Sequence, residues 1–175
     1  MKKLLVVVDM QNDFIDGSLG SPEAQAIVPN VVKKMSEWDG DIIMTRDTHS
    51  EKYLETREGR HLPVEHCIRG TEGHKINPLV WEAALKISES TNLSMLNKKT
   101  FGSTALPELI KCEDYDRVEL VGLCTDICVV SNAMLIKARF PELDIAVDSS
   151  CCAGVTPDSH NAALTTMKMC QIEVL

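Results

Sequence analysis

Short runs of apolar residues recur along the chain, and longer stretches of mixed polarity separate them. The first run, 4–8 (LLVVV), is continuous and rich in valine, which is typical of a strand covered on both faces of a parallel sheet. The strands predicted from such runs are 4–8, 41–45, 93–97, 117–123, 143–147 and 171–175.

Helical patterns lie between these runs and begin at good N-cap residues. Ser21 stands before Pro22, and Thr156 stands before Pro157, an order that is typical of helix starts. Pro29 predicts a break near the middle of the first helix, because proline removes a backbone donor and clashes with the preceding turn. The helices predicted in this way are 21–38, 78–88, 103–112, 127–139 and 156–169.

Strands that alternate with helices predict an α/β fold, with a doubly wound, mainly parallel six-stranded sheet and helices on both faces. The expected arrangement has three layers and is Rossmann-like. The length of 175 residues suits a single domain over 1–175 with one sizeable core. Residues 50–78 lack steady periodicity and predict a long loop, which is the kind of segment that usually carries binding residues.

Charge and cysteine content narrow the possible partners and the compartment. The net charge is −8, and basic residues cluster only as isolated pairs such as 33–34, so we expect no nucleic-acid partner and no membrane partner. No apolar run is long enough to span a bilayer, and the N-terminal run stops at Asp9 without a cleavage site for a signal peptidase. Seven cysteines, an odd number, favour reduced thiols, so we expect a cytoplasmic protein.

Cys128 is the candidate nucleophile. It follows Thr125 and Asp126 just inside the predicted start of the helix 127–139. The N–H groups and the macrodipole of a helix start stabilise a thiolate, and can lower a thiol pKa from about 8.5 to about 3.5–7.5. The same N–H groups can hold the oxyanion of an attacked carbonyl. The alternative is a buried structural thiol, and this stretch alone does not decide between the two.

Two further charged groups end predicted strands. Asp9 follows the first strand, and Lys98 or Lys99 follows the third. Open α/β sheets bind their ligands outside the carboxyl ends of the strands. The first, third and fourth strands are candidates for adjacency, so we expect Asp9, one of the lysines and Cys128 to converge.

Two segments, 7–14 (VVDMQNDF) and 122–129 (GLCTDICV), resemble in this order the signature motifs of the isochorismatase-like cysteine hydrolases. This superfamily includes the nicotinamidases, and the resemblance covers essentially the whole chain. It implies a catalytic triad of Asp9, Lys98 and Cys128. The spacing to 101–103 favours Lys98 over Lys99 as the lysine of this triad.

The same resemblance implies the surroundings of the nucleophile. The Leu123–Cys124 peptide is expected to be a cis bond that shapes an oxyanion hole. Phe14 and Leu62 are the implied substrate-binding residues, and Leu62 stands where an aromatic side chain usually packs on the substrate ring. Family members are often homo-oligomers, so a homo-oligomer is expected here as well.

A further pair of segments, 46–49 (RDTH) and 62–73 (LPVEHCIRGTEG), resembles the metal-binding pattern of the nicotinamidase branch. The implied ligands are Asp47, His49 and His66. Two imidazoles and a carboxylate suit a divalent ion, with zinc expected first and iron or manganese as alternatives. The remaining loop histidines, His61 and His74, are expected to be exposed.

The predicted function is a cysteine-dependent amidase that acts on nicotinamide or a related small amide through an acyl-thioester. Thr48 replaces the tryptophan of the motif, and one extra residue lies between Pro63 and His66, so the identity of the amide stays open. One alternative is another branch of the superfamily that acts on a carbamoyl compound, whereas the cysteine disfavours isochorismate hydrolysis.

The other alternative is a thiol redox or metal-binding protein that uses Cys124, Cys128, Cys151 and Cys152. Cys124 and Cys128 are four positions apart and lack the two-residue spacing of a dithiol redox site.

Overall fold

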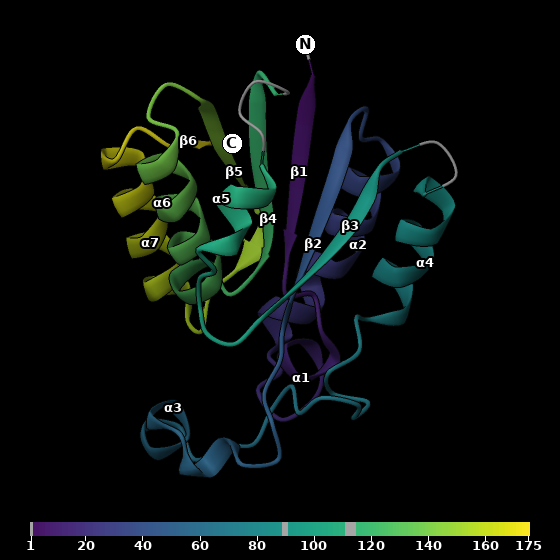
Figure 1. The fold of residues 1–175 in the computed structure, drawn as a ribbon, viewed down its shortest axis with the longest axis vertical. Coiled ribbons are helices and arrows are strands. Elements are labelled where there is room, and N and C mark those ends of the chain that lie inside the picture. The colour runs from purple at the N-terminus through teal and green to yellow at the C-terminus, as the bar shows by residue number, and fades with distance from the viewer. Residues whose placement is uncertain (1, 89–90, 111–114) are drawn as a thin grey trace.

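The computed structural model describes residues 2–88, 91–110 and 115–175, and within them six parallel strands form one sheet (Figure 1). The strand order is β3-β2-β1-β4-β5-β6. New strands are added on one side of β1 and then on the other, so the fold is doubly wound and the predicted class is confirmed. The strands are β1 (Lys3–Val8), β2 (Asp41–Asp47), β3 (Leu93–Lys98), β4 (Arg117–Leu123), β5 (Asp144–Ala153) and β6 (Glu173–Val174).

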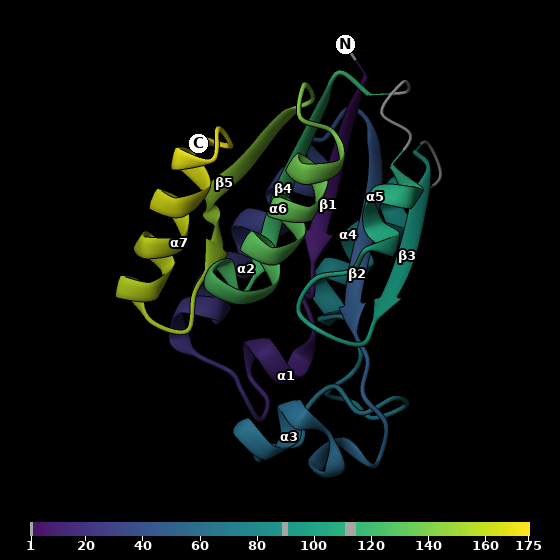
Figure 2. The same cartoon turned by 60° about the vertical axis from the view of Figure 1, so that its left-hand side comes forward.

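Helices cover both faces of the sheet and complete the three layers (Figures 1 and 2). One apolar core lies between the sheet and α2 (Pro22–Ser36) with α4 (Pro78–Ile87). The other core lies between the opposite face and α5 (Ala105–Leu109), α6 (Val130–Arg139) and α7 (Pro157–Met169). Alternate residues of β1 enter the two cores, which explains why its sequence is apolar without interruption.

Helix α2 differs from its prediction because it continues through Pro29. The start is as expected, since Ser21 accepts a hydrogen bond from the N–H of Ala24 at 3.1 Å and Pro22 occupies the first turn. A proline inside a helix costs about 3 kcal/mol or more. Five buried side chains of α2 pack on the sheet, and this packing offsets the loss. The residues are Ala24, Ile27, Val28, Val31 and Met35.

Several other boundaries also differ. Strand β5 extends to Ala153, well beyond the predicted end, and its register against β4 shifts between Leu120 and Gly122. This irregularity accommodates the polar residues 148–150, which interrupt the apolar pattern and led to the shorter prediction. Helix α5 ends at Leu109, and the predicted end at 112 lies outside the described residues.

The predicted adjacency of the first and third strands is wrong, because β2 lies between β1 and β3. The carboxyl ends of all strands still meet at one edge of the sheet. Short helices come directly after two of these strands in the chain: α1 (Asn12–Ile15) after β1, and η1 (Tyr53–Glu55) with α3 (Arg57–His61) after β2. Helices α1 and α3 lie beyond this edge of the sheet, at the bottom of Figure 1. No described helix is long and apolar enough to cross a membrane.

An ion group also ties α2 to the sheet. The ammonium of Lys34 pairs with the buried carboxylate of Glu119 on β4, and lies 2.9 Å from Asp148 Oδ2 on β5.

We expect Lys34→Met to lower the free energy of unfolding by about 2–4 kcal/mol, because it leaves two carboxylates without their cation. Urea unfolding measures this change. The exposed neighbour Lys33 provides the control, and Lys33→Met is expected to stay within about 0.5 kcal/mol. Equal effects of the two variants would contradict the stabilising role of this ion group.

Candidate active site

Three predicted residues meet at the carboxyl edge of the sheet. Asp9 follows β1, Lys98 ends β3, and Cys128 lies in the turn η3 (Thr125–Val129) that follows β4. Lys98 Nζ lies 2.6 Å from Asp9 Oδ2 and 3.5 Å from Cys128 Sγ. The Lys98 side chain is long enough to reach past β2, so this group forms although β1 and β3 are not neighbours. The neighbouring Lys99 is exposed, which favours Lys98 as the functional lysine.

Burial sets the protonation of this group. Asp9 is fully buried and Cys128 is 4% exposed. Burial raises the pKa of the Cys128 thiol well above its usual value, and the nearby Asp9 carboxylate raises it further. Burial likewise raises the pKa of Asp9, although Lys98 opposes the shift. Lys98 itself has a raised pKa, because the neighbouring anions outweigh its own burial. These shifts favour the ammonium form of Lys98 and the thiol form of Cys128, with Asp9 paired to Lys98.

The expected depression of the Cys128 pKa is therefore wrong. The prediction assumed that the positive end of a helix would have the largest effect on the pKa of the thiol. The thiol instead lies in a π-helical turn, inside the protein, and beside an anion. Desolvation and like charge outweigh the field of the helix.

The backbone before Cys128 has an unusual shape. The peptide between Leu123 and Cys124 is cis, at the bond that the resemblance implies. Gly122 has φ +117°, and a Cβ at this position would lie 2.1 Å from the carbonyl oxygen of Val8, so only glycine fits. The carbonyl of Cys124 accepts hydrogen bonds from the N–H groups of Ile127 and Val129 at 3.1 and 3.0 Å.

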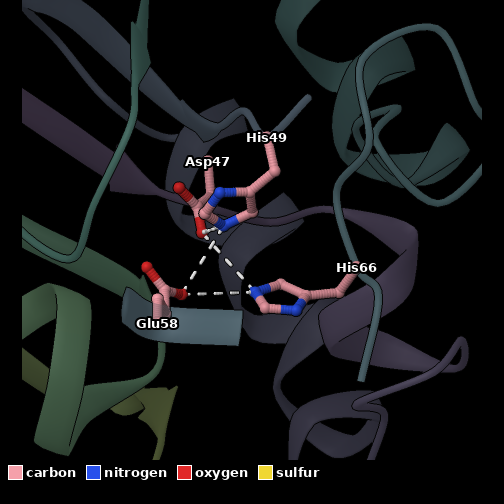
Figure 3. A group of neighbouring side chains, drawn as sticks. All are labelled: Asp47, His49, Glu58 and His66. Atoms are coloured by element: carbon pink, nitrogen blue, oxygen red, sulfur yellow. Dashed lines mark hydrogen bonds and ion pairs between the residues drawn. The ribbon is translucent and has the colours of Figure 1, made fainter. Parts of the chain in front are cut away.

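A second cluster lies beside the triad and consists of Asp47, His49, Glu58 and His66 (Figure 3). One ligand atom from each residue lies within 4.8 Å of the other three. His49 Nε2 lies 3.0 Å from Asp47 Oδ2 and 3.6 Å from Glu58 Oε1. His66 Nε2 lies 3.8 and 3.7 Å from the same two oxygens. The two imidazoles and two carboxylates thus face a common centre.

This donor set fits a divalent metal ion. Ligands at about 2.1 Å from one ion stand about 3.4 Å apart in a tetrahedron, close to the separations of the cluster. His66 Nδ1 is 2.8 Å from the carbonyl of Val64, a contact that leaves Nε2 free to act as a ligand. Burial lowers the pKa of His49, but the hydrogen bond and the negative charge of Asp47 outweigh it, so the pKa is raised.

A polar network holds the cluster in place. The side-chain amide of Gln11 donates to the carbonyls of Asp47 and His74, at 2.9 Å each, and accepts from the N–H of Asp47 at 2.7 Å. Thr48 Oγ1 lies 2.9 Å from His74 Nε2. His74 is therefore buried, and its predicted exposure is wrong, whereas His61 is exposed as predicted.

A cavity of about 400 Å³ opens over both clusters. Phe14, Leu62 and Phe101 form apolar parts of its wall, and Cys128 lies in its lining together with His66. The ring of Phe14 stands 5.5 Å from that of His66. The cavity is thus large enough for a small aromatic molecule that contacts the thiol and the metal-type cluster at once.

The sequence prediction missed Glu58, Tyr53 and Thr45. Glu58 is one of several acids in the loop 50–78, and no spacing distinguished it. Tyr53 is fully buried against the rings of His49 and His66, at centroid distances of 4.7 and 4.9 Å. Thr45 Oγ1 donates to Asp9 Oδ1 at 2.7 Å. A polar residue inside the apolar run of β2 was the available signal for Thr45.

The parallel sheet and the Asp9–Lys98–Cys128 group at its carboxyl edge define an α/β protein with a candidate cysteine nucleophile. The chain belongs to the isochorismatase family, because the model of the isochorismatase domain matches residues 3–175. An uncharacterised isochorismatase family protein of Bacillus subtilis is 28% identical over 94% of this chain and 93% of its own length.

Two solved structures support this assignment. The nicotinamidase/pyrazinamidase of Bacillus subtilis has a TM-score of 0.87 and 26% identity, and covers 99% of both chains. The pyrazinamidase of Pyrococcus horikoshii, in complex with zinc, has a TM-score of 0.78 and 27% identity. It covers 100% of this chain and 99% of its own.

Proposed function

We propose that the chain is a cysteine-dependent amidase of the nicotinamidase type, which hydrolyses nicotinamide or a related small ring amide to the acid and ammonia. The observation that carries this proposal is the position of Cys128, next to the Lys98–Asp9 pair and in the same cavity as His66. A thiol for the carbonyl and a metal-type cluster for a ring nitrogen are the two groups that such a substrate requires. The names of the similar solved structures point to the same chemistry.

In the first half-reaction, Asp9 accepts the proton of the Cys128 thiol while sulfur attacks the amide carbonyl. The raised pKa of Asp9 makes its carboxylate a better proton acceptor than an ordinary aspartate. Collapse of the tetrahedral intermediate breaks the C–N bond, and Asp9 returns the proton to the departing ammonia. The product of this half is an acyl-thioester on Cys128.

In the second half-reaction, Asp9 takes a proton from water as the water oxygen attacks the thioester carbonyl. The C–S bond breaks, the acid leaves, and the thiol regains the proton from Asp9. Lys98 keeps its positive charge throughout and stabilises the negative charge that moves between Asp9 and sulfur.

Backbone N–H groups complete the site. We assign the oxyanion hole to the N–H of Cys124, which belongs to the cis peptide, and to the N–H of Cys128 within the turn that follows. Phe14 and Leu62 contact the flat faces of the ring from the apolar part of the cavity wall that they form. Leu62 is 39% exposed and offers an aliphatic surface in place of an aromatic one.

Asp47, His49, Glu58 and His66 would hold the divalent ion, for which zinc is the first candidate and iron or manganese the others. The bound ion supplies a Lewis acid that orients the ring nitrogen of the substrate. The protein residues align the amide over the thiol, and this alignment lowers the entropic barrier to attack.

The proposal also covers the domain organisation, the location, the partners and the assembly of the protein. Residues 1–175 act as one hydrolase domain on a small molecule in the cytoplasm, without a nucleic-acid or membrane partner, and assemble as a homo-oligomer. The negative net charge supports the lack of a nucleic-acid or membrane partner, and the six free cysteines among the described residues support the cytoplasmic location. The resemblance to the family supports the homo-oligomer.

The metal is tested by elemental analysis of the purified chain. We expect about one equivalent of divalent ion per chain, lost in His66→Ala because one of the imidazole donors is removed. His61→Ala is the matched control and is expected to keep the ion, because His61 is exposed and outside the cluster. A wild-type chain that stays free of metal after reconstitution with zinc, iron or manganese would contradict the nicotinamidase assignment.

The substrate is tested by ammonia release from nicotinamide, pyrazinamide and simple carbamoyl compounds, before and after chelation. We expect hydrolysis of the ring amides and its loss on chelation. Turnover of carbamoyl compounds alone, unaffected by chelation, would instead favour the other branch of the family.

A further inference from the structure

The turn that carries Cys128 is attached to the first turn of α7. Thr125 is fully buried, and its Oγ1 lies 2.8 Å from Nδ1 of His160 on α7. Burial lowers the pKa of His160, so its ring is neutral at neutral pH and offers one donor and one acceptor. The hydroxyl and the imidazole therefore form a hydrogen bond in either tautomer.

A second attachment lies one residue further along the turn. Both carboxylate oxygens of Asp126 accept from the backbone N–H of Val155, at 3.2 Å each. Val155 and Gly154 line the catalytic cavity, immediately before the N-cap of α7. A Cβ at Gly154 would lie 2.9 Å from His160, so the loop and the helix are in close contact.

We propose that these two attachments, the Thr125–His160 hydrogen bond and the hydrogen bonds from Val155 N–H to Asp126, make Thr125, Asp126 and His160 positioning residues for the reaction. Together they are here called the clasp. The inference rests on the proposed amidase function and deepens it. The clasp joins the turn that orients the Cys128 thiol and N–H to the cavity wall at 154–155. The three residues act through Cys128 and Val155, and the mechanism above uses none of their side chains.

The physical reason is that attack requires the sulfur, the oxyanion donors and the substrate wall to keep fixed relative positions. A misplacement of about 1 Å can reduce turnover by about 100-fold. Residues 125–129 form one turn of π-helix, a rare form that often lies at functional sites. The later part of this turn is held by α6, where Ser131 Oγ and Asn132 Nδ2 donate to the carbonyls of Ile127 and Cys128. The clasp holds the first part of the turn, residues 125 and 126, against α7 and the loop before it.

The test uses Thr125→Val, which has nearly the same shape but no hydroxyl. We expect kcat for the ring amide to fall about 10- to 100-fold, with KM changed less than about threefold, because the alignment of the thiol changes more than ring binding. Thr125→Ser restores the hydroxyl and is expected to stay within about threefold of wild type.

His160 tests the other side of the same hydrogen bond. The side-chain amide of asparagine can replace Nδ1, whereas that of glutamine replaces Nε2. We expect His160→Asn to retain turnover and His160→Gln to lose it to the level of Thr125→Val. The double variant Thr125→Val/His160→Gln is expected to lose no more than either single variant, because both remove one interaction.

The control is Thr165→Val, also in α7, which removes a hydroxyl bond of 2.9 Å to the carbonyl of Asn161 on the exposed side. It is expected to leave kcat unchanged. Additive losses in the double variant, or equal kcat effects of Thr125→Val and Thr165→Val, would overturn the positioning role.

Hydrogen exchange tests the clasp without any substrate. Peptides that cover 124–130 and 154–160 are expected to exchange faster in Thr125→Val and as in wild type in Thr165→Val. Unchanged exchange in both peptides would overturn the clasp itself. If the wild-type chain hydrolyses no amide, the proposed function fails, and the exchange result alone then supports or overturns the clasp.

Discussion

Cys128→Ala is expected to reduce amide turnover by about four orders of magnitude or more while the chain stays folded. Its thiol supplies the only sulfur that the proposed mechanism uses, and a removed nucleophile leaves only binding and oxyanion stabilisation. Alanine is smaller than cysteine, so the 4% exposed position accepts it without a clash. Ammonia release measures the loss, and circular dichroism with thermal unfolding establishes that the fold persists.

Two other cysteines serve as comparisons for this variant. Cys170→Ser, at the end of α7, is expected to keep wild-type turnover. Cys124→Ser is expected to have only a modest effect, because the mechanism uses the backbone of Cys124. A loss of ammonia release in Cys124→Ser equal to that in Cys128→Ala would contradict the assignment that the mechanism uses only the backbone of Cys124.

Asp9→Asn is expected to reduce turnover by about 10³-fold, because an amide of the same size cannot accept the thiol proton. Lys98→Met is expected to cause a comparable loss. The methionine fills the space of the aliphatic stem, but the negative charges of Asp9 and of the forming thiolate then lack their cation, 2.6 and 3.5 Å away in the wild type.

Lys99→Met is the matched control for the lysine, since Lys99 is adjacent and exposed. It is expected to retain turnover within about twofold. Small and equal losses for the two lysine variants would remove Lys98 from the mechanism. A full loss for Lys99→Met with normal activity for Lys98→Met would exchange their roles.

The sequence predicted those parts of the molecule that follow from local patterns. Continuous apolar runs indicated the parallel strands, and Ser21 and Thr156 marked two helix starts through their caps. Strand ends located Asp9, Lys98 and Cys128, and the family motifs indicated which lysine was involved. These features depend on neighbouring residues, which a sequence displays directly.

Other features depend on tertiary contacts, and these the sequence did not reveal. Pro29 stays helical because α2 packs on the sheet, and His74 is buried because Thr48 and Gln11 gather around it. The raised pKa of Cys128 comes from burial beside Asp9, residues that are far apart along the chain. Glu58 joins the metal-type cluster only after the loop 50–78 has folded over the sheet edge.

Asp47 belongs to both halves of the site at once. Its Oδ2 faces His49 at 3.0 Å, while its Oδ1 lies 3.5 Å from the ammonium of Lys98. One carboxylate is therefore shared between the metal-type cluster and the Lys98–Asp9–Cys128 group. A substitution at Asp47 removes the carboxylate from both halves at once, whereas His66→Ala removes one imidazole and keeps the carboxylate that faces Lys98. The charge of the Asp47 carboxylate couples the two halves of the site electrostatically. Occupancy of the ion site and reactivity of the Cys128 thiol are therefore expected to vary together.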